Sequence, residues 1–159
     1  MESILKVKNC SVRNKNIRSV RMEECIFCKI VNGKIKSRTI YENDKVLSFL
    51  DVNPRSPGHS LVIPKKHVET LDKLDGQTAG EILKVAKKVE KLLKKSLSPE
   101  AFTLGINDGE AAGQEVPHLH LNIIPRFKND GGKPIHSVVN NPPEKELSEI
   151  ENLILEEKK

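Results

Sequence analysis

Residues 118–126 read His-Leu-His-Leu-Asn-Ile-Ile-Pro-Arg, and they predict a β-strand over 116–124 that the following proline ends. Side chains alternate between the two faces of a strand, so His118, His120 and Asn122 share one face while apolar residues occupy the other. The apolar face can pack against a helix. A neutral imidazole buried without a partner costs about 1–3 kcal/mol, so we expect the two histidines to be exposed, hydrogen-bonded, metal-bound or reactive.

The loop before this strand favours a reactive role. Residues 107–114 read Asn-Asp-Gly-Glu-Ala-Ala-Gly-Gln, so they supply glycines where a backbone comes close to another group, and amide side chains that can donate to an anion. Gly113 alone would predict only a turn. Because two histidines follow directly, the loop predicts a phosphate-binding seat that faces a nitrogen nucleophile.

Four further strands and two helices are predicted from the hydrophobic pattern. Apolar residues recur at three- and four-residue spacing between Gly76 and Pro99, as expected for a long helix with one buried face. A last helix is predicted from about residue 144 to residue 156, after two prolines. The strands are predicted over Thr39–Tyr41, Val46–Asp51, His59–Ile63 and Ala101–Ile106. Strands in hairpin order with one long helix among them favour an α+β domain, with an antiparallel sheet covered on one face.

Length and charge favour one domain without a membrane span. A chain of 159 residues is long enough for one hydrophobic core, and no apolar run approaches the roughly 18 residues that cross a bilayer. The formal charge of +5 lies in residues 1–22, which hold six Lys or Arg and one Glu. We expect these residues to be a basic extension, either disordered or outside a natural start at Met22, and residues 23–159 to be the domain. The extension has no aromatic residue to stack on bases, so a nucleic acid partner is not expected, and we expect a soluble, cytoplasmic protein.

Cys25 and Cys28 are a second source of candidate chemistry. Three cysteines in a chain of this length do not suit a disulfide framework, so this Cys-x-x-Cys pair is either a redox pair or part of a metal site. A redox pair usually opens a helix after a strand, whereas residues 29–33 read Lys-Ile-Val-Asn-Gly, a short helical turn ended by glycine. The pattern favours a metal, provided that two more ligands exist.

Several ordered segments resemble the histidine triad family, whose signature is His-φ-His-φ-His-φ-φ with φ apolar. The resemblance extends from Cys25 through Phe127. It includes Cys-Ile-Phe-Cys-Lys-Ile at 25–30, Ser-Phe-Leu-Asp at 48–51, Pro-Gly-His-Ser-Leu-Val-Ile-Pro-Lys-Lys-His at 57–67 and Ala-Gly-Gln at 112–114. The Cys-x-x-Cys start and the Ile-Ile-Pro-Arg ending are most similar to prokaryotic members near the dinucleoside polyphosphate hydrolase branch. The resemblance implies a five-stranded antiparallel sheet with the long helix on it, and a homodimer in which two sheets are continuous.

The resemblance also implies catalytic roles. His120 matches the middle histidine of the family, which attacks the α-phosphorus of a nucleotide and becomes nucleotidylated before water cleaves the adduct. His59 matches a histidine that orients the other imidazoles by hydrogen bonding, although a histidine in a loop could equally be structural. Asn122 stands where the family usually has its third histidine, which puts proton transfer to the leaving group in doubt.

A structural zinc site is implied for the same reason. In members that begin with Cys-x-x-Cys, His118 resembles the fourth ligand of a site completed by Cys25, Cys28 and His67. Two thiolates and two imidazoles suit tetrahedral zinc and leave no open position, so the metal is expected to be structural. No catalytic cofactor is expected.

The nucleotide contacts implied by the resemblance come from three parts of the chain. Asp51 matches the residue that holds the ribose hydroxyls. Glu115 is a departure, since this position often carries Ser or Thr and a carboxylate repels phosphate; either only its backbone N–H is used or the substrate differs. The walls around the base match Phe27, Ile30 and Phe49, and the phosphate cradle matches Asn107, Gly113, Gln114 and Glu115.

Three hypotheses about function follow. The first is a nucleotidyl hydrolase or transferase that cleaves a nucleoside phosphoanhydride or phosphoramidate at the α-phosphorus through His120, with a nucleoside mono- or polyphosphate as its ligand. The second is a zinc-stabilised nucleotide-binding protein whose catalysis is weak or lost, and Asn122 is its main support. The third, a zinc-knuckle protein that binds nucleic acid through residues 1–22, is the least favoured.

Overall fold

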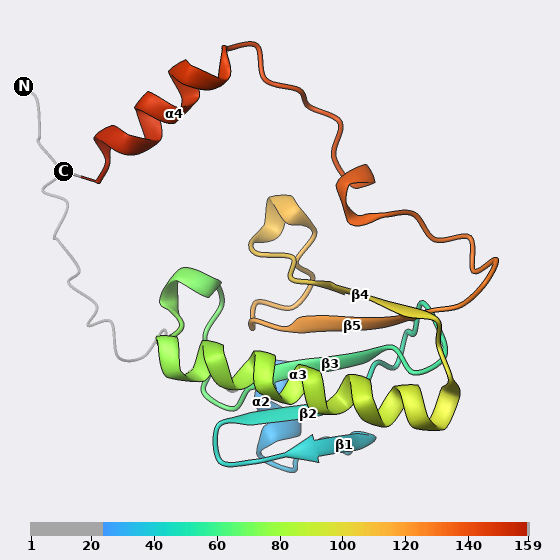
Figure 1. Cartoon of the computed structure of the whole chain (residues 1–159). Coiled ribbons are helices and arrows are strands. Elements are labelled where there is room, and N and C mark those ends of the chain that lie inside the picture. The colour runs from blue at the N-terminus through green and yellow to red at the C-terminus, as the bar shows by residue number, and fades with distance from the viewer. Residues whose placement is uncertain (1–23, 159) are drawn as a thin grey trace, which may run out of the picture.

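The computed structural model describes residues 24–158, and its centre is a five-stranded antiparallel sheet (Figure 1). The strands run in the order β1-β2-β3-β5-β4, and every neighbouring pair is antiparallel. Their bounds are β1 (Thr39–Glu42), β2 (Val46–Leu50), β3 (Ser60–Pro64), β4 (Ala101–Gly105) and β5 (Leu121–Arg126). The predicted α+β class and five-stranded sheet are confirmed. The basic extension predicted over 1–22 lies outside the described residues, so it stays a prediction.

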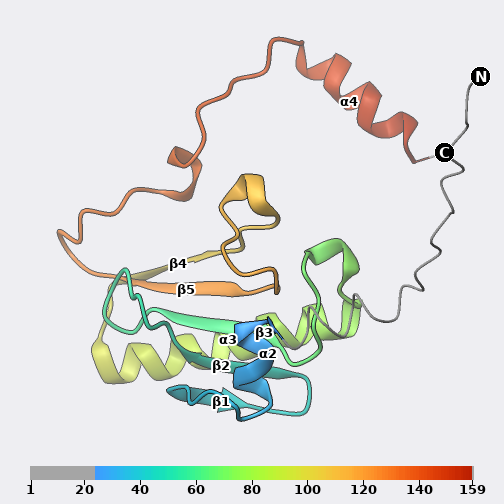
Figure 2. The same cartoon turned by 180° about the vertical axis from the view of Figure 1, so that it is seen from behind.

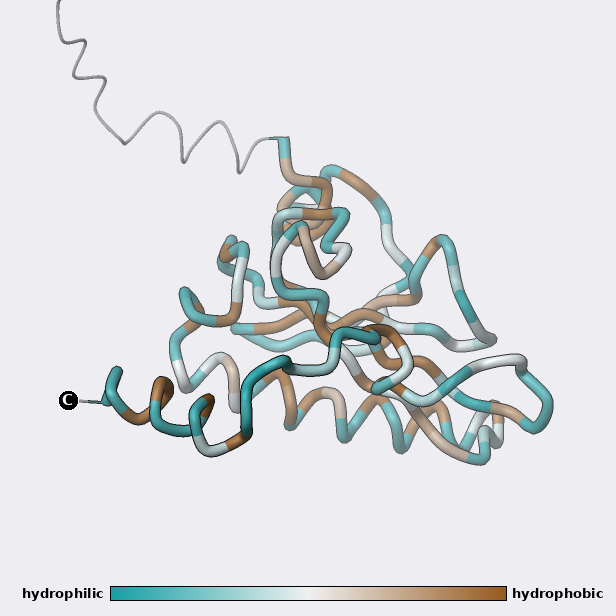
Figure 3. Tube along the Cα trace, turned by 90° about the horizontal axis from the view of Figure 1, so that it is seen from above, coloured by the Kyte–Doolittle hydropathy of each residue, from teal (hydrophilic) through white to brown (hydrophobic). Residues whose placement is uncertain are grey.

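One face of the sheet is covered by α3 (Gly76–Leu97), the long helix that the sequence predicts. Leu83 and Leu92 share its apolar pattern but are 63% and 47% exposed, because each lies one residue, or about 100° around the helix, from a buried position. Figure 3 shows hydrophobic stretches in the sheet and an alternation of hydrophobic and hydrophilic residues along α3. The buried residues of α3 recur at helical spacing and are Thr78, Ile82, Val85, Ala86, Val89 and Leu93.

The opposite face of the sheet carries α2 (Ile26–Val31), as the view from behind shows (Figure 2). Phe27 and Cys28 of this helix are buried in a second cluster with Phe49, Leu61 and other apolar residues. Because β3 is covered on both faces, all five of its residues are buried. The sequence predicted a short helical turn after Cys28, and the structure shows a helix that begins at Ile26 and includes Cys28.

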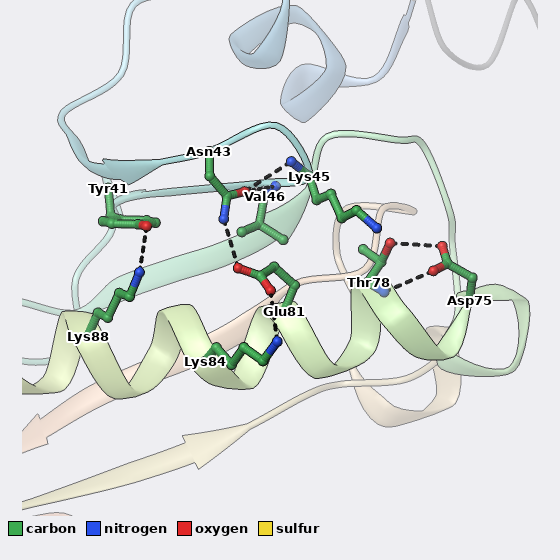
Figure 4. A network of polar contacts seen from close by, with 9 residues as sticks. All are labelled: Tyr41, Asn43, Lys45, Val46, Asp75, Thr78, Glu81, Lys84 and Lys88. Atoms are coloured by element: carbon green, nitrogen blue, oxygen red, sulfur yellow. Dashed lines mark hydrogen bonds and ion pairs between the residues drawn. The ribbon is translucent and has the colours of Figure 1, made fainter.

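Polar contacts attach α3 to the β1–β2 hairpin (Figure 4). The Asn43 side chain accepts the backbone N–H groups of Lys45 and Val46 through Oδ1, and it donates to Glu81 of α3 over 2.9 Å. Asp75 is the N-cap of α3, and it accepts the backbone N–H of Thr78 over 2.9 Å. A side-chain oxygen that accepts from an N–H of the first turn satisfies a donor that the helix leaves unpaired.

The strand predicted over 116–124 is wrong in its bounds. β5 begins at Leu121, so His118 and His120 lie in the segment that leads into the strand. The backbone N–H of His118 donates to the Val116 carbonyl over 2.7 Å, and that of Leu119 donates to the Val68 carbonyl over 2.7 Å. These donors are therefore used outside the sheet, which hydropathy alternation does not reveal.

The proline after this stretch does not end the strand, contrary to the prediction. Pro125 lies inside β5, opposite Phe102 of β4. The pairing of β5 with β3 ends at Ile123, so the last part of β5 is hydrogen-bonded on one side only. Proline lacks a backbone N–H, and it is tolerated in a strand where one side needs no donor.

The predicted C-terminal helix is confirmed as α4 (Leu147–Glu156), and it stands away from the sheet (Figure 1). It begins three residues after the predicted start because Glu146 still has extended backbone, and none of its residues is buried. Within residues 24–158, no helix combines the length and the apolar character that crossing a membrane requires.

Candidate functional site

A hollow of about 520 Å³ lies on the α2 side of the sheet, and it collects most of the residues that the sequence singled out. That volume falls within the range of small-molecule sites. Its walls come from α2, the end of β2 with the loop that follows, the β4–β5 connection and β5. The residues predicted for catalysis or nucleotide binding that line it are Phe27, Ile30, Phe49, Asp51, His59, Asn107, Gly113, Glu115, His120 and Asn122.

His120 lines the hollow, and one of its two ring nitrogens already forms a hydrogen bond. Its Nδ1 is 2.8 Å from the His118 carbonyl, and a carbonyl can only accept, so Nδ1 carries the proton. The second nitrogen, Nε2, then holds the lone pair of a neutral imidazole. Phe27 stands edge-on to this ring with centroids 5.4 Å apart. A half-buried, correctly tautomerised imidazole is what a nitrogen nucleophile requires.

A chain of hydrogen bonds fixes His59 and Asn122 beside it. The backbone N–H of Arg55 donates to His59 Nδ1 over 3.2 Å, so the ring proton is on Nε2. That Nε2–H donates to Asn122 Oδ1 over 3.1 Å, and Asn122 Nδ2 donates to the Gly105 carbonyl over 3.2 Å. The order of donors and acceptors fixes the orientation of the Asn122 amide. His59 therefore orients Asn122, and within residues 24–158 no hydrogen bond joins it to the ring of His118 or His120.

The loop that presents His59 depends on a glycine. Gly58 has φ +83°, and a Cβ there would lie 2.6 Å from Cδ1 of Leu97 at the end of α3. Glycine is therefore favoured by the backbone conformation, and a Cβ at this position would also displace the Leu97 side chain.

Asp51 lies at the end of β2 with one carboxylate oxygen free to receive a ligand. Its Oδ1 accepts the backbone N–H of Asn53 over 2.8 Å. Its Oδ2 is 3.7 Å from His59 Nδ1, a nitrogen that already accepts from Arg55, so in the neutral histidine no proton lies between them. Oδ2 can therefore accept from a hydroxyl in the pocket.

The apolar residues of this end belong both to the core and to the pocket. Phe27 and Phe49 are 7% and 4% exposed, and their rings meet edge-on at 5.7 Å. Both line the hollow together with the half-buried Ile30. A flat apolar ligand group can therefore lie against a surface that the core already holds rigid.

The loop between β4 and β5 holds the residues predicted to contact phosphate, and only some of them line the hollow. Asn107 Nδ2 donates to the Gly113 carbonyl over 3.3 Å, and both residues line the hollow. Gln114 does not line it, because its side chain accepts from the Gly109 N–H and donates to the Glu69 carbonyl. Gln114 therefore braces the loop from behind, and its predicted contact with a nucleotide stays a prediction.

The four residues predicted to bind metal come together next to this hollow. Cys25, Cys28, His67 and His118 are all buried, and their ligand atoms lie within 4.8 Å of one another. His118 Nδ1 is 3.5 Å from Cys25 Sγ and 3.6 Å from Cys28 Sγ, and His67 Nδ1 is 3.3 Å from Cys28 Sγ. In a tetrahedral zinc site a sulfur and a nitrogen ligand are about 3.5 Å apart. The donor set and its spacing therefore fit a four-coordinate zinc ion.

Burial shifts the protonation of two of these groups. It lowers the pKa of His118 to about 4, which keeps the ring neutral near pH 7 as a metal ligand must be. Burial, together with the neighbouring Cys25, raises the pKa of the Cys28 thiol to about 12. Buried thiolates are costly unless a cation neutralises them, which is the charge that a metal would bring.

His118 connects this cluster to the hollow. Its Nε2–H donates to the Pro64 carbonyl over 2.8 Å, which directs Nδ1 toward the two sulfurs. Its own carbonyl accepts the proton of His120 Nδ1. The same residue therefore contributes to the metal cluster and sets the tautomer of the proposed nucleophile.

Several residues of the hollow were not predicted. Ile124 shares a face of β5 with Asn122, so strand alternation could have found it. Arg55 and Ile135 carry no comparable signal, because they reach the hollow only through the tertiary path of the chain.

At the end of β5, the Arg126 guanidinium donates two hydrogen bonds to the Asp130 carboxylate, at 2.6 and 2.9 Å, and these fix the turn that follows the strand. His136, for which the sequence predicted no role, is exposed.

Comparisons with known proteins agree with this geometry. The HIT domain model matches residues 32–129. An uncharacterized HIT-like protein of Methanocaldococcus jannaschii is 48% identical over 107 residues, which cover 67% of this chain and 82% of that protein. An adenosine 5'-monophosphoramidase of Schizosaccharomyces pombe is 41% identical over 108 residues, 68% of this chain and 78% of its own length.

A solved structure adds a metal-bound relative. A zinc-bound histidine triad family protein from Mycobacterium smegmatis superimposes with a TM-score of 0.66 at 35% identity, over 69% of this chain and 79% of that one. With a family model that matches most of the described residues and a close relative of similar length, the chain belongs to the HIT, or histidine triad, family.

Proposed function

We propose that this protein is a nucleotidyl hydrolase or transferase that cleaves a nucleoside phosphoanhydride or phosphoramidate at the α-phosphorus. The observation that carries the proposal is the tautomer of His120, whose Nδ1–H is held by the His118 carbonyl while Nε2 is left with its lone pair in the hollow. Asp51 at one end and Asn107 at the other supply the polar contacts that a ribose and a phosphate need. The relative in S. pombe is a monophosphoramidase, and it supports this class of substrate.

The chemistry proceeds in two displacements. His120 Nε2 attacks the α-phosphorus, a P–N bond forms, and the bond to the leaving group breaks with its electron pair on the leaving atom. Water then attacks the phosphorus of the adduct, the P–N bond returns its pair to Nε2, and the water proton passes to solvent. Asn107 and the backbone N–H of Glu115, which donates to no other group within residues 24–158, stabilise the negative charge on the phosphate oxygens.

We propose zinc as the metal of the Cys25, Cys28, His67 and His118 cluster, with a structural role. The zinc-bound mycobacterial relative supports the identity of the ion. A filled coordination shell of four protein ligands leaves no position for substrate or water. When bound, the ion would cross-link α2 to the segment that carries His120.

A second candidate function is nucleotide binding with weak or lost catalysis. Asn122 favours it, because the amide already accepts from His59 and donates to Gly105. An amide cannot give a proton to a departing group. The two candidates share the pocket and differ in whether the His120 adduct forms and turns over.

An adduct assay separates the two candidates. The protein is incubated with an adenosine nucleotide labelled at the α-phosphorus, quenched, and examined for acid-labile label. His120→Ala tests the nucleophile, and His136→Ala is the matched control because His136 is exposed and outside the hollow. The proposal predicts label in the parent and in His136→Ala and none in His120→Ala. Tight nucleotide binding without any label would favour the binding protein instead.

We also propose that the protein is cytoplasmic and that it belongs near the dinucleoside polyphosphate hydrolase branch of the family.

We propose in addition that the protein is a homodimer. β4 supports the dimer, since it is an edge strand and its Leu104 is 37% exposed. An exposed edge strand is suited to pairing with a second sheet. Sedimentation should then give twice the chain mass of 17.8 kDa, and a monomer would contradict the proposal.

A further inference from the structure

Glu115 brings a negative charge to the wall that this hollow shares with a neighbouring one. The residue is exposed and follows directly on the loop formed by Asn107 and Gly113. Within residues 24–158 no ion pair joins it to a basic side chain. Because no basic side chain in that range pairs with this carboxylate, its charge attracts cationic groups and repels anionic groups that enter the loop end of the hollow.

The other charged residues of the hollow do not cancel this field where it acts. Lys36, Asp51 and Arg55 also line the hollow, so its formal charges balance in sum. Asp51 and Arg55 lie at the end of β2 and in the loop after it, and Lys36 precedes β1. β3 and β5 separate β2 from β4, from which the loop of Glu115 departs. The basic groups therefore belong to the Asp51 end, and Glu115 to the opposite end.

The two ends assign the two halves of a substrate. The Asp51 end has the apolar walls of Phe27, Ile30 and Phe49 and suits a nucleoside, and His120 stands between it and the loop. A group displaced by His120 therefore departs toward the loop, where Glu115 lies. We infer that Glu115 is a specificity-determining residue that selects, by charge, leaving groups that are neutral or cationic over leaving groups that are anionic, such as polyphosphates.

This inference rests on the proposed nucleotidyl transfer and adds the class of substrate to it. Two unit charges about 7 Å apart in a partly solvated pocket interact strongly enough to change a rate roughly tenfold. The interaction is screened by salt, because the Debye length is about 8 Å at physiological ionic strength. It is therefore distinguishable from a contact that depends on shape.

The test uses three adenosine 5'-phosphoramidates whose amines have the same length and end in a methyl, an ammonium or a carboxylate group. The bond broken is the same in all three, so only the charge of the tail differs. For the parent protein, kcat/KM should be highest for the cationic tail and lowest for the anionic tail, with about a tenfold span. The span should shrink as salt is added.

Two variants complete the test. Glu115→Gln should reduce the ratio of cationic to anionic kcat/KM from about tenfold to about one. Glu110→Gln removes one carboxylate from the same loop. Glu110 lines only the neighbouring hollow, whereas Glu115 lines both, so Glu110→Gln should leave the ratio near the parental value. A parental ratio of one, or a ratio that survives Glu115→Gln, would overturn the inference. Absence of the His120 adduct with all three compounds would instead overturn the proposed function, so the two failures are distinct.

Discussion

Asn122 stands where the histidine triad signature has its third histidine, and both ends of its amide are already engaged. His59 donates to its oxygen, and its nitrogen donates to the Gly105 carbonyl. The amide can therefore polarise and orient, but it cannot transfer a proton. Loss of a general acid typically costs about 10²- to 10⁴-fold in rate.

The Asn122→His variant tests this role. We expect it to raise the rate at least roughly tenfold for substrates whose leaving group needs a proton, and to change nucleotide affinity little, because proton transfer belongs to the transition state. Stopped assays with a good and a poor leaving group would measure the effect. Equal rates for parent and variant on both substrates would show that position 122 has no acid role.

Asp51 gives a second prediction at the scale of one side chain, since its Oδ2 is available to a ligand hydroxyl. Asp51→Ala should weaken binding of adenosine monophosphate by about 1–3 kcal/mol, because a buried hydroxyl would lose its acceptor. Asp51→Asn keeps an oxygen acceptor and should lose less. Calorimetry on the parent and both variants measures the difference, and equal affinity for all three would rule out a ribose contact here.

At the scale of elements, the metal cluster is the contact between α2 and the segment before β5. Purified protein should contain about one zinc per chain. Chelation or Cys25→Ser should lower the melting temperature. The nucleotide affinity of the protein that remains folded should change less, because none of the four ligands lines the hollow. Cys10→Ser is the matched control, since Cys10 is outside the proposed set. Metal-free protein with a Cys25–Cys28 disulfide would contradict the site.

The N-cap of α3 gives a pH prediction. Hydrogen bonds from the Thr78 backbone and side chain lower the pKa of Asp75 below its usual 3.8. A carboxyl with a lowered folded-state pKa stabilises the fold above its unfolded-state pKa, and this contribution is lost as the pH falls toward the folded-state value. Asp75→Asn keeps an acceptor at every pH. The melting temperature of the parent relative to Asp75→Asn should therefore drop as the pH falls below about 4, and parallel pH curves would contradict this role of Asp75.

At the scale of the whole molecule, periodicity predicted the elements well where packing alone decides them. The stripe of Val85 and Val89 predicted α3, and the fold class followed from strand order. Bounds failed where backbone hydrogen bonds decide. Nothing in hydropathy shows that the Leu119 N–H bonds to Val68 rather than to a strand, or that Pro125 lies beyond the reach of β3.

The candidate site divides in the same way. Residue type and spacing brought forward His118 and His120, and also the pair of Cys25 and Cys28. Only the resemblance joined His67 to that pair. The orientation of Asn122 could not be predicted, because it depends on three successive hydrogen bonds from Arg55, His59 and Asn122 itself. Residues that arrive by a long path, such as Ile135, are invisible to any short window of sequence.

The separation of the metal ligands along the chain has a consequence for how the protein is made. Cys25 and His118 are 93 residues apart, and closing so long a loop costs conformational entropy that only the finished contacts repay. A chain emerging from the ribosome holds three of the four ligands for a long stretch of synthesis, at about 5–20 residues per second. Until His118 emerges, the nascent chain lacks both the fourth ligand and the carbonyl that sets the His120 tautomer. The nascent protein therefore completes the proposed metal site and positions the proposed nucleophile in the same late step, and a chain that ends before His118 does neither.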